Sequence, residues 1–218
     1  MPNKNLRNLG GIPLIGHSIR VALAMTEIDR VVCSTDSEEI RRVSKDFGAE
    51  APFLRPSELA SDSSPEFDAW KHLASYLISQ GAETNQAIVS LPPTAPLRRV
   101  VDVQRAIDKL FSSDADLVVT FTKTSSNPWF NMVKRETDDT LRPVLGDWKT
   151  APARRQDAPP VYSLVPVAYV TRIGYIQDSS SLFQGRVRGV EVPPETGIDI
   201  DTQRDLDVAA SLYNFTNQ

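Results

Sequence analysis

The fold class is decided by a short run in the middle of the chain, AIVSL at residues 87–91, which the two prolines at 92–93 end. The run shows no alternation of apolar and polar residues, as is typical of a strand buried on both faces of a sheet. Comparable runs occupy residues 30–34 and 116–122, and helical patterns occupy 37–47, 67–79 and 100–111. This succession of strands and helices predicts an α/β fold with a mainly parallel sheet and helices on both of its faces.

The rest of the chain follows the same pattern with one interruption. Residues 13–26 form a helical pattern ahead of the first strand. Residues 127–160 are polar and rich in turns, with a hairpin turn expected at 137–140, and they predict an antiparallel excursion from the sheet. Beyond it we expect strands at 161–171 and 187–192, and a final amphipathic helix at 202–213 with Thr202 as its cap.

The composition of the chain limits the classes of function that it can have. The 218 residues are expected to form a single domain, 1–218. With 24 Lys and Arg against 28 Asp and Glu, the formal net charge of −4 argues against binding to nucleic acid or to an anionic membrane. One cysteine and two histidines argue against a Cys-based zinc cluster. The longest uncharged stretch, 158–171, is too short to span a bilayer, and no secretory signal is visible, so we expect a cytoplasmic location.

Three polar segments are expected to meet at one crevice. Ligands of open α/β sheets bind beyond the carboxyl ends of the strands. Residues 34–36 and 91–98 each follow a predicted strand, and Lys4 and Asn5 lie at the start of the chain. Lys4 and Arg98 are the cations of this expected crevice.

The sharpest local motif is Asp199-Ile200-Asp201. Residues i and i+2 of an extended segment point to the same side, so both carboxylates are expected to face one way. Two carboxylates suit Mg²⁺, which usually takes substrate phosphates and waters as its other ligands. An equally weighted interpretation is that the two aspartates cap the last helix.

Two further segments are weaker candidates. Arg154 and Arg155 are adjacent, and guanidinium groups bind carboxylate or phosphate through paired hydrogen bonds. Taken alone, however, this pair is better explained by a solvated loop or by an ion pair with Asp157. Residues 55–62 indicate only a turn that leads into a helix.

Eight short motifs stand in order along the chain: Lys4-Asn5; Gly11-Ile12-Pro13-Leu14-Ile15; Val32-Cys33-Ser34-Thr35-Asp36; Gly48-Ala49; Pro52-Phe53-Leu54-Arg55-Pro56 with Leu59-Ala60-Ser61-Asp62; Pro93-Thr94-Ala95-Pro96-Leu97-Arg98; Arg154-Arg155-Gln156-Asp157; and Asp199-Ile200-Asp201-Thr202. In this order and spacing they resemble the acylneuraminate cytidylyltransferase family, which includes the CMP-sialic acid synthetases. No single motif is specific, but together they extend the likeness over essentially the whole chain.

The resemblance implies a Rossmann-like sheet of the nucleotide-diphospho-sugar transferase type. It implies a reaction in which CTP and a 2-keto-3-deoxy sugar acid give a CMP-sugar, for lipopolysaccharide or capsule biosynthesis, and pyrophosphate. The family is usually dimeric, so we expect a homodimer in which the excursion at 127–160 reaches the partner's site.

The resemblance also implies roles for individual residues. Asp199 and Asp201 would hold the metal, Mg²⁺, and would be catalytic together with Lys4. The nucleotide would be bound by Lys4, Asn5, Arg55, Asp62, Thr94 and Arg98. The sugar acid would be bound by Arg155, Gln156 and Tyr169.

This chain departs from the family pattern in three places. The family has a strand and a basic, Gly/Ser-rich phosphate loop before its Lys-Asn pair, and we therefore expect the first strand of the sheet to be missing from these 218 residues. Pro92 replaces a glutamine of the sialic acid synthetases, and Val165-Pro166-Val167 replaces Asn-Gly-Ala ahead of Tyr169. Because both changes remove polar groups from the sugar side, we expect a nonulosonic or octulosonic acid other than N-acetylneuraminate.

Two other functions fit parts of the pattern. The missing phosphate loop favours a shortened, non-catalytic nucleotide-sugar binding protein or subunit partner, whereas Lys4, Arg155 and the two aspartates favour an active enzyme. A glycosyltransferase would use Asp199-x-Asp201 as its metal motif. Such motifs usually follow an earlier strand, so this alternative ranks last.

Overall fold

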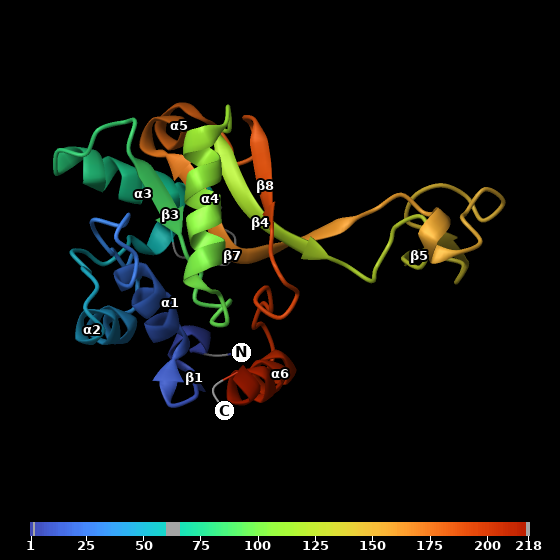
Figure 1. Ribbon diagram of the computed structural model, residues 1–218, viewed down its shortest axis with the longest axis horizontal. Helices are drawn as coiled ribbons and strands as arrows, with labels where there is room; N and C mark the ends of the chain where they lie inside the picture. The colour runs from blue at the N-terminus through green and yellow to red at the C-terminus, as the bar shows by residue number, and fades with distance from the viewer. Residues whose placement is uncertain (2, 60–65, 217–218) are drawn as a thin grey trace.

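A four-stranded mixed sheet forms the centre of the protein (Figure 1). The computed structural model describes residues 1, 3–59 and 66–216. The strands lie in the order β3-β7-β4-β8. Their bounds are β3 Ala87–Ser90, β4 Leu117–Lys123, β7 Tyr162–Arg172 and β8 Val187–Glu191, close to the predicted strands.

The direction of β7 differs from the expected parallel arrangement. β4 and β8 pair in parallel, whereas β7 is antiparallel to both β3 and β4. Thus β3, β4 and β8 point the same way, as predicted, and β7 runs against them. The reason is the connection that precedes β7, which is a turn-rich excursion without a crossover helix; a chain that simply turns back returns as an antiparallel strand.

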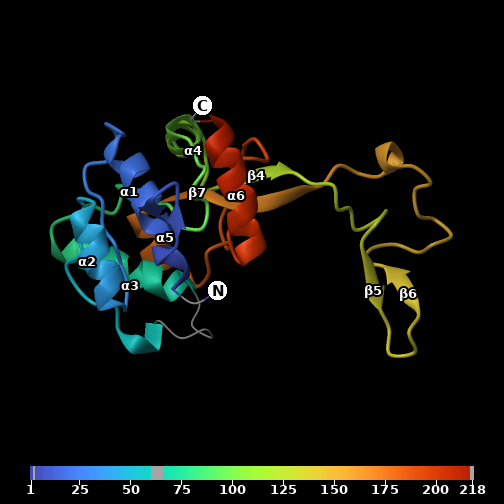
Figure 2. The ribbon, with the colours of Figure 1, turned by 90° about the horizontal axis from the view of Figure 1, so that it is seen from below.

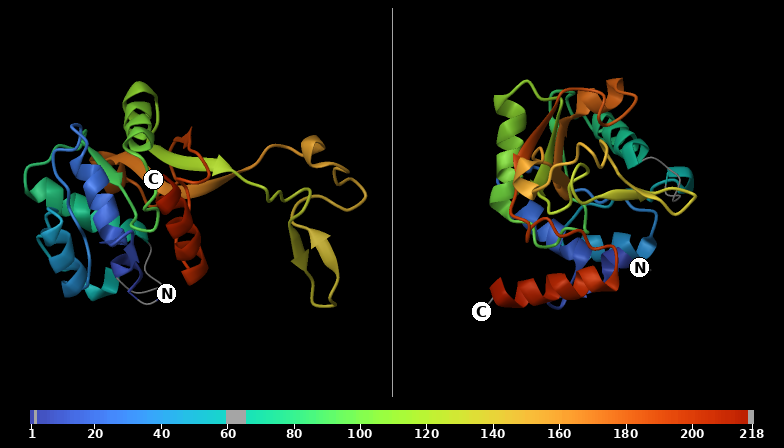
Figure 3. Two further views of the ribbon diagram at one scale, coloured as in Figure 1. Left: turned by 60° about the horizontal axis from the view of Figure 1, so that its bottom comes forward. Right: turned by 90° about the vertical axis from the view of Figure 1, so that its right-hand side faces the viewer.

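Helices cover both faces of the sheet, as predicted (Figure 3). On one face α4 (Val100–Ser112) buries an apolar stripe that includes Val103 and Leu110 against β4, β7 and β8. On the other face α3 (Glu66–Ser79) and the short α5 (Ile173–Asp178) share a second apolar cluster with β3. The sequence patterns predicted α3 and α4 but not α5.

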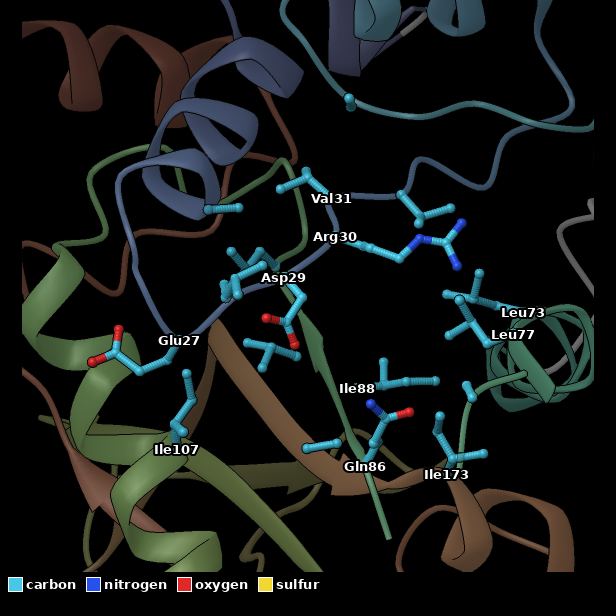
Figure 4. A pocket seen from close by; sticks show the side chains of 18 of the residues that line it. Glu27, Asp29, Arg30, Val31, Leu73, Leu77, Gln86, Ile88, Ile107 and Ile173 are labelled. Atoms are coloured by element: carbon cyan, nitrogen blue, oxygen red, sulfur yellow. The ribbon is translucent and has the colours of Figure 1, made fainter. Parts of the chain in front are cut away.

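The strand expected at residues 30–34 does not form a ladder. Only Val32 makes a bridge, in parallel with Glu50. The segment packs against α1 (Leu14–Leu23) and α2 (Glu38–Asp46). Its other edge lines a groove (Figure 4), and no strand among the described residues pairs with that edge, so the bridge to Glu50 is on one side of the segment. The helix that follows is confirmed: the hydroxyl of Ser37 accepts a hydrogen bond from the Ile40 amide and caps α2.

Residues 124–161, which we call the arm, extend away from the rest of the protein (Figures 1 and 2). Within the arm β5 (Val133–Arg135) and β6 (Leu141–Pro143) form an antiparallel hairpin, as predicted. Asp139 in its turn has a positive φ of 69°. Asn127, buried at the base, donates from Nδ2 to the Pro159 carbonyl at 2.9 Å and so ties the two ends of the arm together.

The ladder between β4 and β7 is broken where the arm begins. Val119 is opposite Tyr169, but the next residue, Thr120, is opposite Val165, so residues 166–168 of β7 bulge out. The buried hydroxyl of Thr120 fills the break: it lies 2.7 Å from the Val165 carbonyl and accepts a hydrogen bond from the Ala168 amide. Bulges of this kind bend a strand and re-aim its side chains.

The two ends of the described chain pack together. A 3₁₀ turn, η1 (Lys4–Leu6), leads into a hairpin of β1 (Asn8–Leu9) and β2 (Ile12–Pro13). This hairpin lies against α6 (Gln203–Thr216) through a small apolar cluster: Leu9, Leu14, Ile200, Leu206 and Ala209. Two further 3₁₀ turns are η2 (Ser57–Leu59) and η3 (Arg155–Asp157). None of the described helices is long and apolar enough to cross a membrane.

Candidate functional site

The amino end of the chain meets the segment before α6 at an ion pair. The Lys4 ammonium lies 2.7 Å from Oδ1 of Asp201. Two of the predicted catalytic residues are therefore in direct contact. The Asp201 carboxylate keeps most of its surface in solvent, with 67% of the side chain exposed, so it stays accessible to a ligand.

Asp199 and Asp201 flank a buried residue on an extended segment. Ile200 is fully buried while both aspartates are exposed, which is the alternation expected for carboxylates on one side. The Ile200 amide donates to the Thr94 carbonyl at 2.9 Å. This bond fixes the Asp199–Asp201 segment to the loop after β3, and it brings Thr94 to the site.

The cap of α6 does not use the carboxylates of Asp199 and Asp201. The Thr202 hydroxyl accepts from the Asp205 amide at 3.3 Å, and the Asp205 carboxylate in turn accepts from the amides of Asp201 and Thr202. The hydrogen bond from the Thr202 hydroxyl is the main reason that the pKa of Asp205 is lowered. Because this reciprocal arrangement caps the helix, the Asp201 carboxylate is left for other partners.

A pocket of about 400 Å³ lies beyond the carboxyl ends of β3 and of the 30–34 segment. Asn5, residues 34–36 and residues 91–93 all line it. Parts of the three polar segments that were expected to share a crevice therefore meet there. Residues 94–98 and the two expected cations, Lys4 and Arg98, are not in its lining, although Lys4 is next to Asn5 in the chain.

Arg55 lines the same pocket. Its amide donates to the Thr35 carbonyl at 2.8 Å, and its guanidinium lies 3.6 Å from an oxygen of Asp36. The buried Nε of Arg55 has no hydrogen-bond partner among the described residues. A cation held in place in this way retains a donor for a ligand.

The sequence patterns missed two residues of the pocket wall, Glu66 and Trp70 of α3. The indole of Trp70 packs edge-on against the ring of Tyr169, with 5.9 Å between centroids. Burial, and then the negative charges of Glu66 and Asp199, raise the pKa of Tyr169. The one available signal was the i, i+4 spacing of Glu66 and Trp70, which puts both on one helix face.

Arg98 lies inside the protein. Its side chain donates to the Ser18 hydroxyl and to the carbonyls of Pro92 and Pro166. Burial lowers the pKa of its guanidinium. Arg98 thus ties the loop after β3 to the bulge of β7, and all of these contacts are with the chain's own groups.

Arg155 and Gln156 are exposed and lie in η3, which belongs to the arm that Figure 1 shows extending away from the rest of the protein. Arg154, their neighbour, pairs with Asp157 at 2.8 Å, as the simpler interpretation of this cluster expected. Asp62, a predicted nucleotide contact, lies outside the described residues. The predicted site is therefore split between the body of the protein and the arm.

The donor set at Asp199 and Asp201 fits a hard divalent cation. Within residues 1, 3–59 and 66–216, no cluster of three or more His, Cys, Asp or Glu side chains could hold a metal alone. Two exposed carboxylates on one side of a chain suit Mg²⁺, which completes its shell with waters and substrate phosphates.

The sheet with helices on both faces, and the pocket at the carboxyl ends of its strands, are those of an α/β nucleotidyltransferase. The chain belongs to the cytidylyltransferase family, whose model matches residues 1–190. It is 27% identical over 220 residues to post-translational flagellin modification protein B of Campylobacter coli, covering 99% of this chain and 90% of that protein.

A second relative is the CMP-N,N'-diacetyllegionaminic acid synthase of Campylobacter jejuni, 28% identical over 99% of this chain and 90% of that protein. Among solved structures, CMP:2-keto-3-deoxy-manno-octonic acid synthetase complexed with CTP superposes with a TM-score of 0.69 over 99% of this chain and 93% of that one. At 16% sequence identity this likeness shows the shared fold.

Proposed function

We propose that this protein transfers the cytidylyl group of CTP to the anomeric hydroxyl of a 2-keto-3-deoxy sugar acid and releases pyrophosphate. Membership of the cytidylyltransferase family supports the nucleotide and the reaction. The name of the Campylobacter jejuni relative supports a sugar acid similar to N,N'-diacetyllegionaminic acid. The observation that carries the proposal is the contact between Lys4 and Asp201, because it joins a cation suited to phosphate with a carboxylate suited to a metal.

The residues of the body have separate tasks in this reaction. The sugar oxygen attacks the α-phosphorus in line with the departing pyrophosphate, so negative charge grows on the phosphate oxygens. The Lys4 ammonium can turn from Asp201 to these oxygens, and Asn5 and Arg55 line the pocket for the nucleoside. Mg²⁺ held by Asp199 and Asp201 would neutralise the same charge.

The groups between β7 and the pocket suit a sugar with fewer polar groups than N-acetylneuraminate. Tyr169, which packs behind Trp70 of the pocket wall, is protonated at neutral pH like any tyrosine, and burial raises its pKa further, so its hydroxyl can donate to the sugar. Val165 packs against Gly197, and Pro92 has replaced a polar residue of the sialic acid enzymes. We therefore propose a deoxygenated or amino-modified nonulosonic or octulosonic acid.

We also propose that the enzyme works as a homodimer, in which the arm of one copy completes the site of the other. Arg155 and Gln156 lie in η3 of the arm, which extends away from the body that carries Lys4 and Asp201 (Figure 1). The arm exposes several large apolar side chains, as a surface for a second copy would: Met132, Val133, Leu141, Val144, Leu145 and Trp148. The guanidinium of Arg155 would then bind the carboxylate of the sugar acid.

Pyrophosphate release from CTP and Mg²⁺ with a panel of sugar acids tests the function. We expect turnover with at least one modified nonulosonate or octulosonate and less with N-acetylneuraminate. Asp199→Asn and Asp201→Asn should each lower the rate by about 100-fold or more. Asp207→Asn, at an exposed carboxylate on α6 that accepts a hydrogen bond from Gln203, is the matched control and should leave the rate unchanged.

Equal rates for Asp201→Asn and the parent chain would refute the metal assignment. CTP binding without turnover of any sugar acid would refute the enzyme and favour a nucleotide-sugar binding protein.

A further inference from the structure

The hairpin of β1 and β2, which follows Lys4 in the chain, is too small to hold a position by itself. Each of its strands has two residues, and they are joined through Gly10 and Gly11, whose φ angles are 58° and 81°. Pro13 has no N–H to donate to the ladder. Because even a longer two-stranded hairpin is only marginally stable in water, the position of this one depends on its contacts with the rest of the protein.

The ion pair between Lys4 and Asp201 is not strong enough to hold the hairpin. It lies at the surface, where 67% of the Asp201 side chain is exposed, and exposed ion pairs contribute little to stability. The apolar cluster between the hairpin and α6 contributes more. The burial of apolar surface has no directional preference, however, so the orientation of the hairpin is better defined by a directional contact.

His17 of α1 makes such a contact. Its side chain is buried, with 7% exposed, and its Nε2 lies 2.9 Å from the Leu9 carbonyl in β1. Because a carbonyl oxygen can only accept, the ring donates from Nε2. The neutral ring carries the one proton that this bond uses, and burial, which lowers the pKa of His17, favours the neutral form.

The same imidazole also faces the last helix. The ring of Tyr213 in α6 meets it edge-on, with 5.6 Å between the centroids. Tyr213 covers the turn of the hairpin as well, since a Cβ atom on Gly10 would collide with its ring. His17 therefore lies where α1, the hairpin and α6 meet, and Figure 1 shows β1 and α6 next to each other at this point.

Short backbone connections lead from this junction to both members of the ion pair. The Lys4 carbonyl accepts from the Arg7 amide at 3.0 Å, and the Arg7 carbonyl accepts from the Leu14 amide at 2.9 Å, at the start of α1. The Asp201 amide donates to the carboxylate of Asp205 in the first turn of α6. A shift of the hairpin relative to α6 would therefore move the Lys4 ammonium relative to the Asp201 carboxylate.

We propose that His17 is a positioning residue: by donating from Nε2 to the Leu9 carbonyl and packing against Tyr213, it fixes the hairpin between α1 and α6 and so holds Lys4 beside Asp201. It acts through the backbone of the hairpin and not on the substrate. The effect on catalysis rests on the cytidylyl transfer proposed above, whereas the positioning can be measured without any turnover.

Carbodiimide coupling measures the position of Lys4. The reagent activates a carboxylate, and an amine in contact with that carboxylate then forms an amide bond. The yield of the cross-link between Lys4 and Asp201, read by peptide mass spectrometry, therefore reports how often the two groups meet. His17→Gln keeps an N–H donor as many bonds from the backbone as Nε2, so it should keep the yield.

Two other substitutions remove the bond to Leu9. His17→Asn has the same amide one bond closer to the backbone, and His17→Leu has no donor. Each should lower the cross-link yield by about fivefold, as expected for the loss of one buried hydrogen bond. If His17→Leu does not fold, the comparison of the asparagine and glutamine chains still decides the question.

The matched control is Ile19→Val, which shortens another buried side chain of α1, in the cluster with Cys33 and Ala51. It should lower the stability of the chain and leave the cross-link yield unchanged.

Rates of pyrophosphate formation then test whether the effect passes through Lys4. With saturating CTP, His17→Asn should lower kcat by about fivefold in the parent chain but by less than about twofold in a chain that already has Lys4→Met, because substitutions that act through one group are not additive.

Equal cross-link yields in the His17→Gln and His17→Asn chains would overturn the proposal, and so would an equal loss of rate with and without Lys4. A parent chain that forms no pyrophosphate would refute the proposed function, and the cross-link yields would still decide the role of His17.

Discussion

Lys4 and Asp201 are 197 positions apart in the sequence, yet the Lys4 Nζ and the Asp201 Oδ1 are 2.7 Å apart. The contact places the first turn of the chain beside the segment that enters the last helix. The hairpin of β1 and β2 packs against α6 and holds these two segments together. The two groups most suited to phosphate and metal therefore meet through tertiary structure and not through closeness in the sequence.

This pair is expected to matter for activity far more than for stability. Lys4→Met should change the free energy of unfolding by less than about 1 kcal/mol, because exposed ion pairs contribute little. The same change should lower pyrophosphate formation by about 100-fold, since the positive charge facing the phosphates is lost. Urea unfolding and the rate with saturating CTP measure the two effects.

The matched control is Arg42→Met, which removes an exposed ion pair with Asp46 on α2. It should leave both the stability and the rate unchanged. A Lys4→Met chain that unfolds far more easily than the Arg42→Met chain would show that the contact is structural.

We expect Arg98 to stabilise the fold by holding the carbonyls of Pro92 and Pro166 in position. Arg98→Met leaves the carbonyls of Pro92 and Pro166 without this donor, and we expect a loss of about 2–4 kcal/mol of stability. Arg98→Lys keeps the charge but cannot reach both carbonyls and the Ser18 hydroxyl, so it should recover only part of the loss. Full recovery with lysine would show that the charge alone matters.

His17 is expected to make stability depend on pH in the mildly acidic range. Burial lowers the pKa of His17 below 6.5 in the folded protein, where its ring nitrogen lies 2.9 Å from the Leu9 carbonyl. As the pH falls below 6.5 the unfolded chain takes up a proton that the folded chain resists, so stability is lost. Urea midpoints between pH 7.5 and 5 should fall for the parent chain and fall less for His17→Gln. Parallel curves for the two chains would contradict this.

The shared-site dimer makes a prediction about mixtures. Chains with Arg155→Ala and chains with Asp201→Asn should each be nearly inactive. When they are mixed and allowed to exchange, dimers with one intact site should form and activity should return. No recovery on mixing, with both variants dimeric by sedimentation, would place Arg155 outside the partner's site.

The arrangement of helices and strands followed from local patterns. The short, uninterrupted apolar runs at 87–91 and 116–122 indicate buried strands, and the periodicity of residues 67–79 and 100–111 indicates amphipathic helices. The direction of β7 could not be predicted in this way. It depends on how the chain returns from the arm, which is a long-range property.

The candidate site was predictable where it consists of loops at the ends of strands. Asn5 and residues 34–36 met as expected because strand ends share one edge of a sheet. The burial of Arg98 was not predictable, since its partners are two backbone carbonyls and a hydroxyl from distant segments. Trp70 was missed for a related reason: its contact with Tyr169 crosses from a helix to a strand.

The break at Thr120 divides the ladder between β4 and β7 into two segments, and each segment has its own pairing register. Val119 pairs with Tyr169 on one side of the break, and Thr120 pairs with Val165 on the side that leads to the arm. Because a bulge lets the two sides differ in register, a change in the length of the arm leaves the pairing of Tyr169, which contacts Trp70 of the pocket wall, in place. The reach of the arm toward a second copy is therefore adjustable separately from the body of the pocket.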